Sequence, residues 1–122
     1  MLKLKTKWFN KWAKKNSVSD KILFKTIQDL SVNLGTVSLG AGLYKIRTAK
    51  SGQGKSGSHR TIVVYKKSDR VIFVYGFSKT EKDNLSKEEL KYFKKLAKDL
   101  LPIDKSKYKQ MIQNGDFISI GK

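Results

Sequence analysis

The apolar positions at the start of the chain recur at the spacing of α-helices. Trp8 and Trp12 alternate with lysines and predict a short amphipathic helix over residues 5–15. A second apolar set follows Ser19, a residue type that favours helix N-termini, and predicts a helix that ends at Gly35. The apolar members of that second helix are Leu23, Ile27, Leu30 and Leu34.

The middle of the chain changes to a period of two, which is typical of β-strands. Residues 35–42 are rich in Gly and Ser and predict a connection, after which the alternation begins at Leu43. A polar loop is expected over residues 49–59, followed by a strand over residues 60–66. Residues 70–77 are apolar on both faces, as in a central strand, and should pair with the preceding strand as an antiparallel hairpin.

The last third of the chain returns to a helical pattern. Ser86 and Glu89 have the spacing of a capping box and precede an apolar helix that Pro102 ends. Residues 104–114 predict one more short helix, and residues 117–120 predict a terminal strand. This order of elements favours an α+β fold with an antiparallel sheet.

The amino-acid composition of the chain excludes several classes of function. The 122 residues fit one domain, and 27 Lys and Arg against 10 Asp and Glu give a net charge of +17, which favours a polyanionic partner. The absence of cysteine excludes disulfides, thiol nucleophiles and cysteine-based zinc sites. No apolar run is long enough to cross a bilayer, and the first residues lack the apolar stretch of a secretory signal. We therefore expect a cytoplasmic protein with no membrane partner.

Arginine is rare in this lysine-rich chain, and Arg47, Arg60 and Arg70 all fall within one short stretch. Arginine binds phosphate in a bidentate geometry that lysine does not offer, so these residues are the better site candidates. His59, the single histidine, is a candidate general base beside Arg60. With one histidine and no paired carboxylates, we expect neither a metal site nor a cofactor.

The loop over residues 51–57 contains Gly-Lys-Ser, but it is not a Walker motif. Ala49 stands where that motif needs glycine, and a strand rather than a helix should follow the loop. Its glycines would still let backbone N–H groups approach a phosphate closely.

A basic cluster of this kind can cleave RNA without a metal, because the ribose 2′-OH supplies the nucleophile. Arg47 and Arg60 suit the stabilisation of the negative charge that develops on the phosphate. Lys45, Lys55 and Lys79 are candidates for proton transfer, and the sequence leaves the choice among them open.

Several segments together resemble the RelE/ParE superfamily of type II toxins. The first group consists of LYKIR at 43–47, GQGKSG at 52–57 and HRTI at 59–62. Three more segments resemble the HigB-like RelE branch of that superfamily: FVYGFSK at 73–79, NLSKEEL at 84–90 and KTKWFNKWAKK at 5–15. The resemblance covers about residues 3–101.

The resemblance implies a microbial RNase-like fold, in which two N-terminal helices pack on a twisted antiparallel sheet and a C-terminal helix follows. Residues 1–122 would form a single toxin domain, with a core over about 3–101 and a C-terminal extension over 102–122. The resemblance further implies a toxin that cuts mRNA in the ribosomal A site without metal or cofactor. Its partners would be the ribosome, mRNA and a cognate antitoxin of the helix-turn-helix type.

The resemblance also suggests site residues. Lys45 and Arg47 match a basic pair on a long strand, Arg60 matches an arginine that contacts the scissile phosphate, and Lys79 matches a basic residue after the last core strand. Some relatives have an arginine directly after that lysine and a base-stacking tyrosine further on, whereas this chain has Thr80 and then Leu85 or Ser86. The catalytic candidates are therefore Lys45, Arg47, His59, Arg60 and Lys79. The RNA-binding candidates are Lys50, Lys55, Tyr75, Phe77 and Lys82.

Two alternatives stay open at this stage. One is a ParE-like, non-catalytic inhibitor of DNA gyrase, which would not need the basic cluster. The other is an RNA-binding module whose catalysis has decayed.

Overall fold

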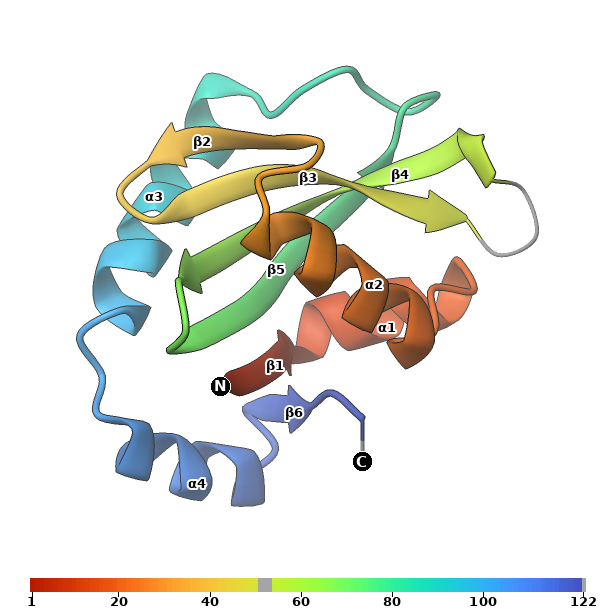
Figure 1. Ribbon diagram of the computed structural model, residues 1–122. Coiled ribbons are helices and arrows are strands. Elements are labelled where there is room, and N and C mark those ends of the chain that lie inside the picture. The colour runs from red at the N-terminus through yellow and green to blue at the C-terminus, as the bar shows by residue number, and fades with distance from the viewer. Residues whose placement is uncertain (51–53, 122) are drawn as a thin grey trace.

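A computed structural model describes residues 1–50 and 54–121, and the side chains of 1–49 and 59–121. Within these residues the chain forms six strands and four helices (Figure 1). The strands are β1 (Leu2–Thr6), β2 (Thr36–Gly40), β3 (Leu43–Lys50), β4 (Gly54–Lys66), β5 (Arg70–Ser78) and β6 (Phe117–Ser119). The helices are α1 (Lys7–Lys15), α2 (Asp20–Ser31), α3 (Lys87–Leu100) and α4 (Lys105–Gln113).

The six strands form one sheet in the order β2-β3-β4-β5-β1-β6. The α+β class is confirmed, but the expected arrangement is wrong in two respects. Strands precede, separate and follow the helices, and β1 runs parallel to β5, so the sheet is mixed rather than antiparallel. The sequence pattern missed β1 because its few residues precede the helix directly. Thr6 ends the strand and caps α1, its hydroxyl accepting a hydrogen bond from Phe9 N at 3.1 Å.

The predicted connection over residues 35–42 contains β2, which pairs antiparallel with β3 at one edge of the sheet. Helix α2 correspondingly ends at Ser31, before the expected Gly35. Strand β3 continues to Lys50 and β4 begins at Gly54, so both strands extend into the polar loop that was expected over residues 49–59.

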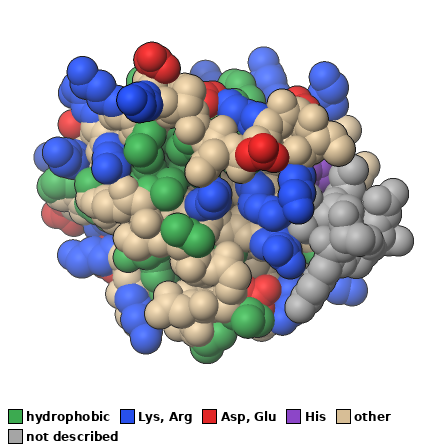
Figure 2. Space-filling view, turned by 90° about the horizontal axis from the view of Figure 1, so that it is seen from above, with side chains coloured by type: hydrophobic (Ala, Val, Ile, Leu, Met, Phe, Trp, Pro, Cys, Tyr) green, Lys and Arg blue, Asp and Glu red, His purple; other side chains and the backbone are tan. Residues whose placement is uncertain are grey.

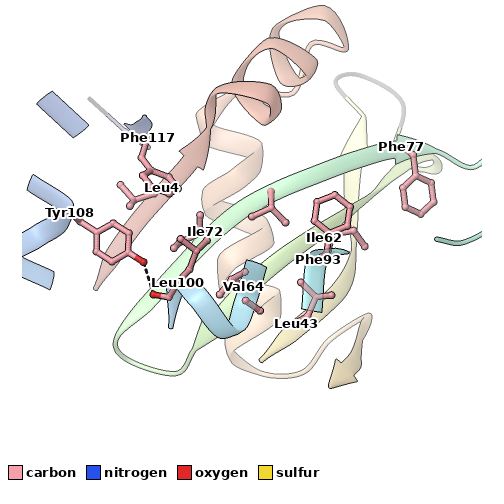
Figure 3. Close-up of a cluster of buried hydrophobic side chains, with 12 residues drawn as sticks. Leu4, Leu43, Ile62, Val64, Ile72, Phe77, Phe93, Leu100, Tyr108 and Phe117 are labelled. Carbon is pink, nitrogen blue, oxygen red and sulfur yellow. Dashed lines mark hydrogen bonds between the residues drawn. The ribbon is translucent and has the colours of Figure 1, made fainter. Parts of the chain in front are cut away.

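Helices cover both faces of the sheet (Figure 1). Helices α1 and α2 pack on one face, over a core that includes Phe9, Leu23, Ile46, Val63 and Phe73. Helix α3 packs on the other face, over a core drawn in Figure 3 that includes Leu43, Ile62, Ile72, Phe93 and Leu100. Strand β5 is buried on both faces, as its apolar run predicted.

The capping box of α3 is confirmed: Ser86 Oγ accepts from Glu89 N, and Glu89 Oε1 accepts from Ser86 N. The C-terminal residues are part of the same packed structure, since β6 pairs with β1. Tyr108 of α4 is fully buried, and its hydroxyl donates to the carbonyl of Leu100 at 2.6 Å (Figure 3).

Arg70 does not join the other two arginines. It lies at the opposite end of β4 and β5 and is buried, with its Nη1 donating to the carbonyls of Leu100 and Ile103. The guanidinium also lies over the Tyr108 ring, at 5.3 Å from its centroid, and pairs with Asp69. Arg70, one of the three arginines singled out from the sequence, therefore joins the end of α3 to the sheet and lies away from Arg47 and Arg60.

Candidate functional site

The sheet face that carries α3 is apolar at one end and basic at the other. Strand β3 places Leu43, Lys45 and Arg47 on this face in turn, since side chains alternate along a strand. On β4, Arg60 is the register partner of Arg47, and Ile62 is the partner of Lys45. Helix α3 covers the apolar end, around Leu43 and Ile62. The basic end, with Lys45, Arg47 and Arg60, extends beyond it.

These three basic residues line one cavity of about 370 Å³. The remaining wall comes from the start of β2 and the residue before it: Gly35, Thr36 and Val37, together with Ile46. Val37 pairs with Lys45 and is half-exposed. Strand β2 is thus a part of the site that the sequence analysis missed. The alternation of polar and apolar residues from Thr36 to Leu39 could have indicated this strand from the sequence.

Lys45 is positioned by the segment between β5 and α3. Its Nζ donates to Asn84 Oδ1 at 3.3 Å, and the same oxygen accepts from the backbone N–H of Leu85 at 3.0 Å. Asn84 lies just before the capping box that starts α3. The segment that begins this helix therefore also orients a lysine of the basic cluster.

Lys82, a predicted RNA-binding residue, forms an ion pair beside this segment. Its Nζ lies 2.5 and 2.6 Å from the two carboxylate oxygens of Glu89, and Tyr75 donates its hydroxyl to the same carboxylate at 3.0 Å. The hydrogen bond from Lys82, with a further one from the Ser86 backbone, lowers the pKa of Glu89 to about 2. The same carboxylate raises the pKa of Lys82. Lys82 is therefore charged and held against α3.

The two predicted stacking rings are covered by other side chains. The Tyr75 ring stacks on Trp8 at 4.7 Å between centroids and packs on Phe93 at 5.1 Å. Phe77 is only 2% exposed. Phe77 is therefore buried away from any nucleobase, whereas the Tyr75 ring is half-buried and packs on Trp8 and Phe93.

His59 lies on the opposite face of the sheet from Arg60, because the two are adjacent in β4. The imidazole is 1% exposed and meets the Trp12 ring edge-on, at 5.0 Å between centroids. The structure thus separates His59 from the basic cluster.

Lys79 is exposed and follows the last residue of β5. Lys50 and Lys55 belong to the paired ends of β3 and β4, but their side chains lie outside the described residues, as does the centre of the glycine-rich loop. Among the residues that the structure describes, no three His, Cys, Asp or Glu side chains gather as a metal site would require.

The basic cluster is suited to binding a phosphate. Two guanidinium groups and one ammonium group line a cavity of a few hundred Å³, a size typical of small-ligand sites. Figure 2 shows a face of the molecule on which Lys and Arg side chains are prominent and gather toward the centre of the view. Fixed cations of this kind stabilise negative charge that develops on a phosphate during reaction.

A comparison with protein families gives a match over almost the whole chain. The model described as "RelE toxin of RelE / RelB toxin-antitoxin system" matches residues 1–120. A comparison with curated protein sequences gives no significant match. No helix in the described part of the chain is long and apolar enough to span a membrane.

Proposed function

The chain belongs to the RelE toxin family, and we propose that it inhibits translation as a ribosome-dependent, metal-independent mRNA endonuclease. The observation that carries the proposal is the convergence of Lys45, Arg47 and Arg60 on one cavity. The resemblance in sequence further suggests the HigB-like branch, a helix-turn-helix antitoxin as partner and action in the cytoplasm, where ribosomes are found.

In the proposed reaction, the 2′-OH of one nucleotide gives its proton to a water molecule, and its oxygen forms a bond to the adjacent phosphorus. The bond from phosphorus to the 5′-oxygen of the next nucleotide breaks, which leaves a 2′,3′-cyclic phosphate and a free 5′-OH. Arg47 and Arg60 hold the two non-bridging oxygens and stabilise the charge that builds up on them. We assign Lys45, oriented by Asn84, to protonate the leaving 5′-oxygen. Lys79, which directly follows β5, is a further positively charged residue that we include in the proposed catalytic set.

The positive net charge of the chain supports the proposal that its substrate is mRNA on the ribosome. A net charge of +17 attracts RNA over long distances, and this attraction should weaken steeply as salt rises. The dispersed lysines thus contribute to association, whereas the residues of the cavity act on one phosphate.

The test is to induce the wild-type chain and Arg60→Ala in bacteria and to map mRNA ends on translating ribosomes. The wild type should arrest growth and cut mRNA within translated frames, and Arg60→Ala should do neither while keeping a native circular dichroism spectrum. Lys67→Ala is the control, because Lys67 is an exposed cation in the turn after β4, at the opposite end of that strand from Arg60.

Two outcomes would contradict the proposal. A folded Arg60→Ala protein that is equally toxic would remove that residue from the site. Growth arrest with a DNA-damage response and intact mRNA would instead indicate a gyrase inhibitor.

A further inference from the structure

A second cavity adjoins the basic cluster. It measures about 480 Å³ and lies between α2 and the part of β3 that extends past β2. Its lining includes Ile22, Lys25, Asp29, Leu34, Arg47 and Ala49. Arg47 and Gly35 line both cavities, so the second cavity borders the arginine that we place against the phosphate.

The shape of this region follows from the turn after α2. Gly35 adopts a left-handed φ of 69°, and its carbonyl accepts from Arg47 N at 3.4 Å. This conformation favours glycine, and it ties the turn to β3 next to the arginine. The side chain of Leu34 is 56% exposed. Together with Ile22 it forms an apolar wall of the cavity, and the described part of the chain covers this wall only in part.

We propose that this second cavity binds the base of a nucleotide that flanks the scissile phosphate. The inference rests on the proposed function and adds to it a determinant of sequence preference. Apolar walls and the aliphatic stems of lysines suit the face of a flat base. Within one nucleotide the ribose separates the base from its phosphate by a few ångströms. A phosphate at Arg47 therefore places the attached base within reach of this cavity.

Asp29 gives the cavity a preference among the nucleobases. Its carboxylate is partly buried, with 23% of the side chain exposed, and Oδ1 accepts from Lys25 Nζ at 3.1 Å. Thr26, also in the lining, already donates its hydroxyl to the Ile22 carbonyl at 2.9 Å. An ionised carboxylate accepts hydrogen bonds and does not donate them. The cavity should therefore favour bases that present an amino group over uracil, which presents a carbonyl oxygen at the equivalent position.

The experiment compares cytidine and uridine 3′-monophosphates, which differ at that amino position. Each is titrated into the isotopically labelled chain, and amide chemical shifts are followed by NMR. We expect shifts at Asp29 and Leu34 and about tenfold tighter binding of the cytidine nucleotide, the difference that one good base-edge contact provides. Asp29→Asn should abolish this preference, and Leu34→Ser should weaken binding of both nucleotides.

Asp99→Asn is the matched control. Asp99 pairs with Lys95 four residues before it on α3, as Asp29 pairs with Lys25 on α2, but it lies outside the cavity. This variant should keep the preference. Equal affinities for the two nucleotides, or shifts confined to the residues around Arg60, would overturn the inference.

Mapping on ribosomes separates this inference from the proposed function. Wild-type cuts should favour an amino-bearing base over uracil at one position beside the cleaved bond, and Asp29→Asn should lose that bias. Cleavage with the same bias in both proteins would refute the base site alone. Absence of cleavage by the wild type would refute the endonuclease, while the nucleotide titration would still decide the base site.

Discussion

Arg47 and Arg60 are direct register partners on β3 and β4, and their side chains share one face of the sheet. Like charges placed directly opposite each other on a sheet face are destabilising. We therefore expect their juxtaposition to lower the stability of the fold, and the proposed binding of a phosphate explains why both are present.

Replacing Arg47 should raise the stability of the fold and abolish cleavage. Arg47→Gln removes the cross-strand repulsion from an exposed position, and we expect the free energy of unfolding to rise by about 0.2–1 kcal/mol. Cleavage on ribosomes should be lost in the same variant. Urea denaturation and mRNA end mapping measure the two effects, with Lys67→Gln as the control. A clear loss of stability would show that Arg47 is held by favourable contacts instead.

The Lys82–Glu89 pair predicts a pH dependence of stability. Because the pKa of Glu89 is lowered from 4.5 to about 2 by its hydrogen bond from Lys82, the ionised carboxylate favours the folded state. This contribution is complete above about pH 4.5 and is lost as the pH falls toward 2. Glu89→Gln should therefore cost about 1–2 kcal/mol at pH 7, and the cost should shrink through that acidic range.

The measurement is urea denaturation of both proteins between pH 7 and pH 2. Glu88→Gln is the control, since Glu88 lies in the same first turn of α3 and is exposed. A cost for Glu89→Gln that is the same at pH 7 and pH 2 would refute the role of the ion pair.

Substitutions of Tyr108 test whether the fold depends on residues 102–122, which the sequence analysis treated as an extension. The ring is fully buried, and Leu100 O accepts from both Tyr108 and Arg70. Tyr108→Ala should cost about 3–5 kcal/mol, as truncation of a buried aromatic ring does. Tyr108→Phe should cost about 1 kcal/mol, because it removes one hydrogen bond from a carbonyl that keeps another. Thermal unfolding of both variants checks the difference, and equal small losses would mean that α4 is loosely attached.

Gly76 is constrained by a tryptophan ring. A Cβ at this buried position would lie 2.5 Å from Trp12 Cζ3, so the ring must move if alanine is introduced. Gly76→Ala should cost about 1–3 kcal/mol, as overpacking of a core does. In the double variant with Trp12→Leu, the alanine should cost much less than it does alone. A double-mutant cycle measures this coupling, and additive effects would contradict the clash.

The regular elements followed from local patterns in the sequence. The capping box at Ser86 and Glu89 predicted the start of α3, and the apolar run after Arg70 predicted a strand buried on both faces. The two short edge elements, β1 and β2, were missed because a five-residue strand is defined by its pairing partner more than by its own pattern. The parallel pairing of β1 with β5 joins residues about 70 positions apart, which periodicity does not record.

For the site, the sequence by itself determined that Lys45 and Arg47 share a face, since alternation along a strand is a local property. Only the tertiary structure decided that Arg60 stands opposite Arg47 while Arg70 is buried at the other end of the sheet. It also decided that His59 and Phe77 are buried and that β2 completes the cavity. The reason is that strand register and the cover provided by α1 and α3 depend on residues distant in the chain. The net charge of +17 was fixed by composition, but the fold decided which few of these charges line one cavity.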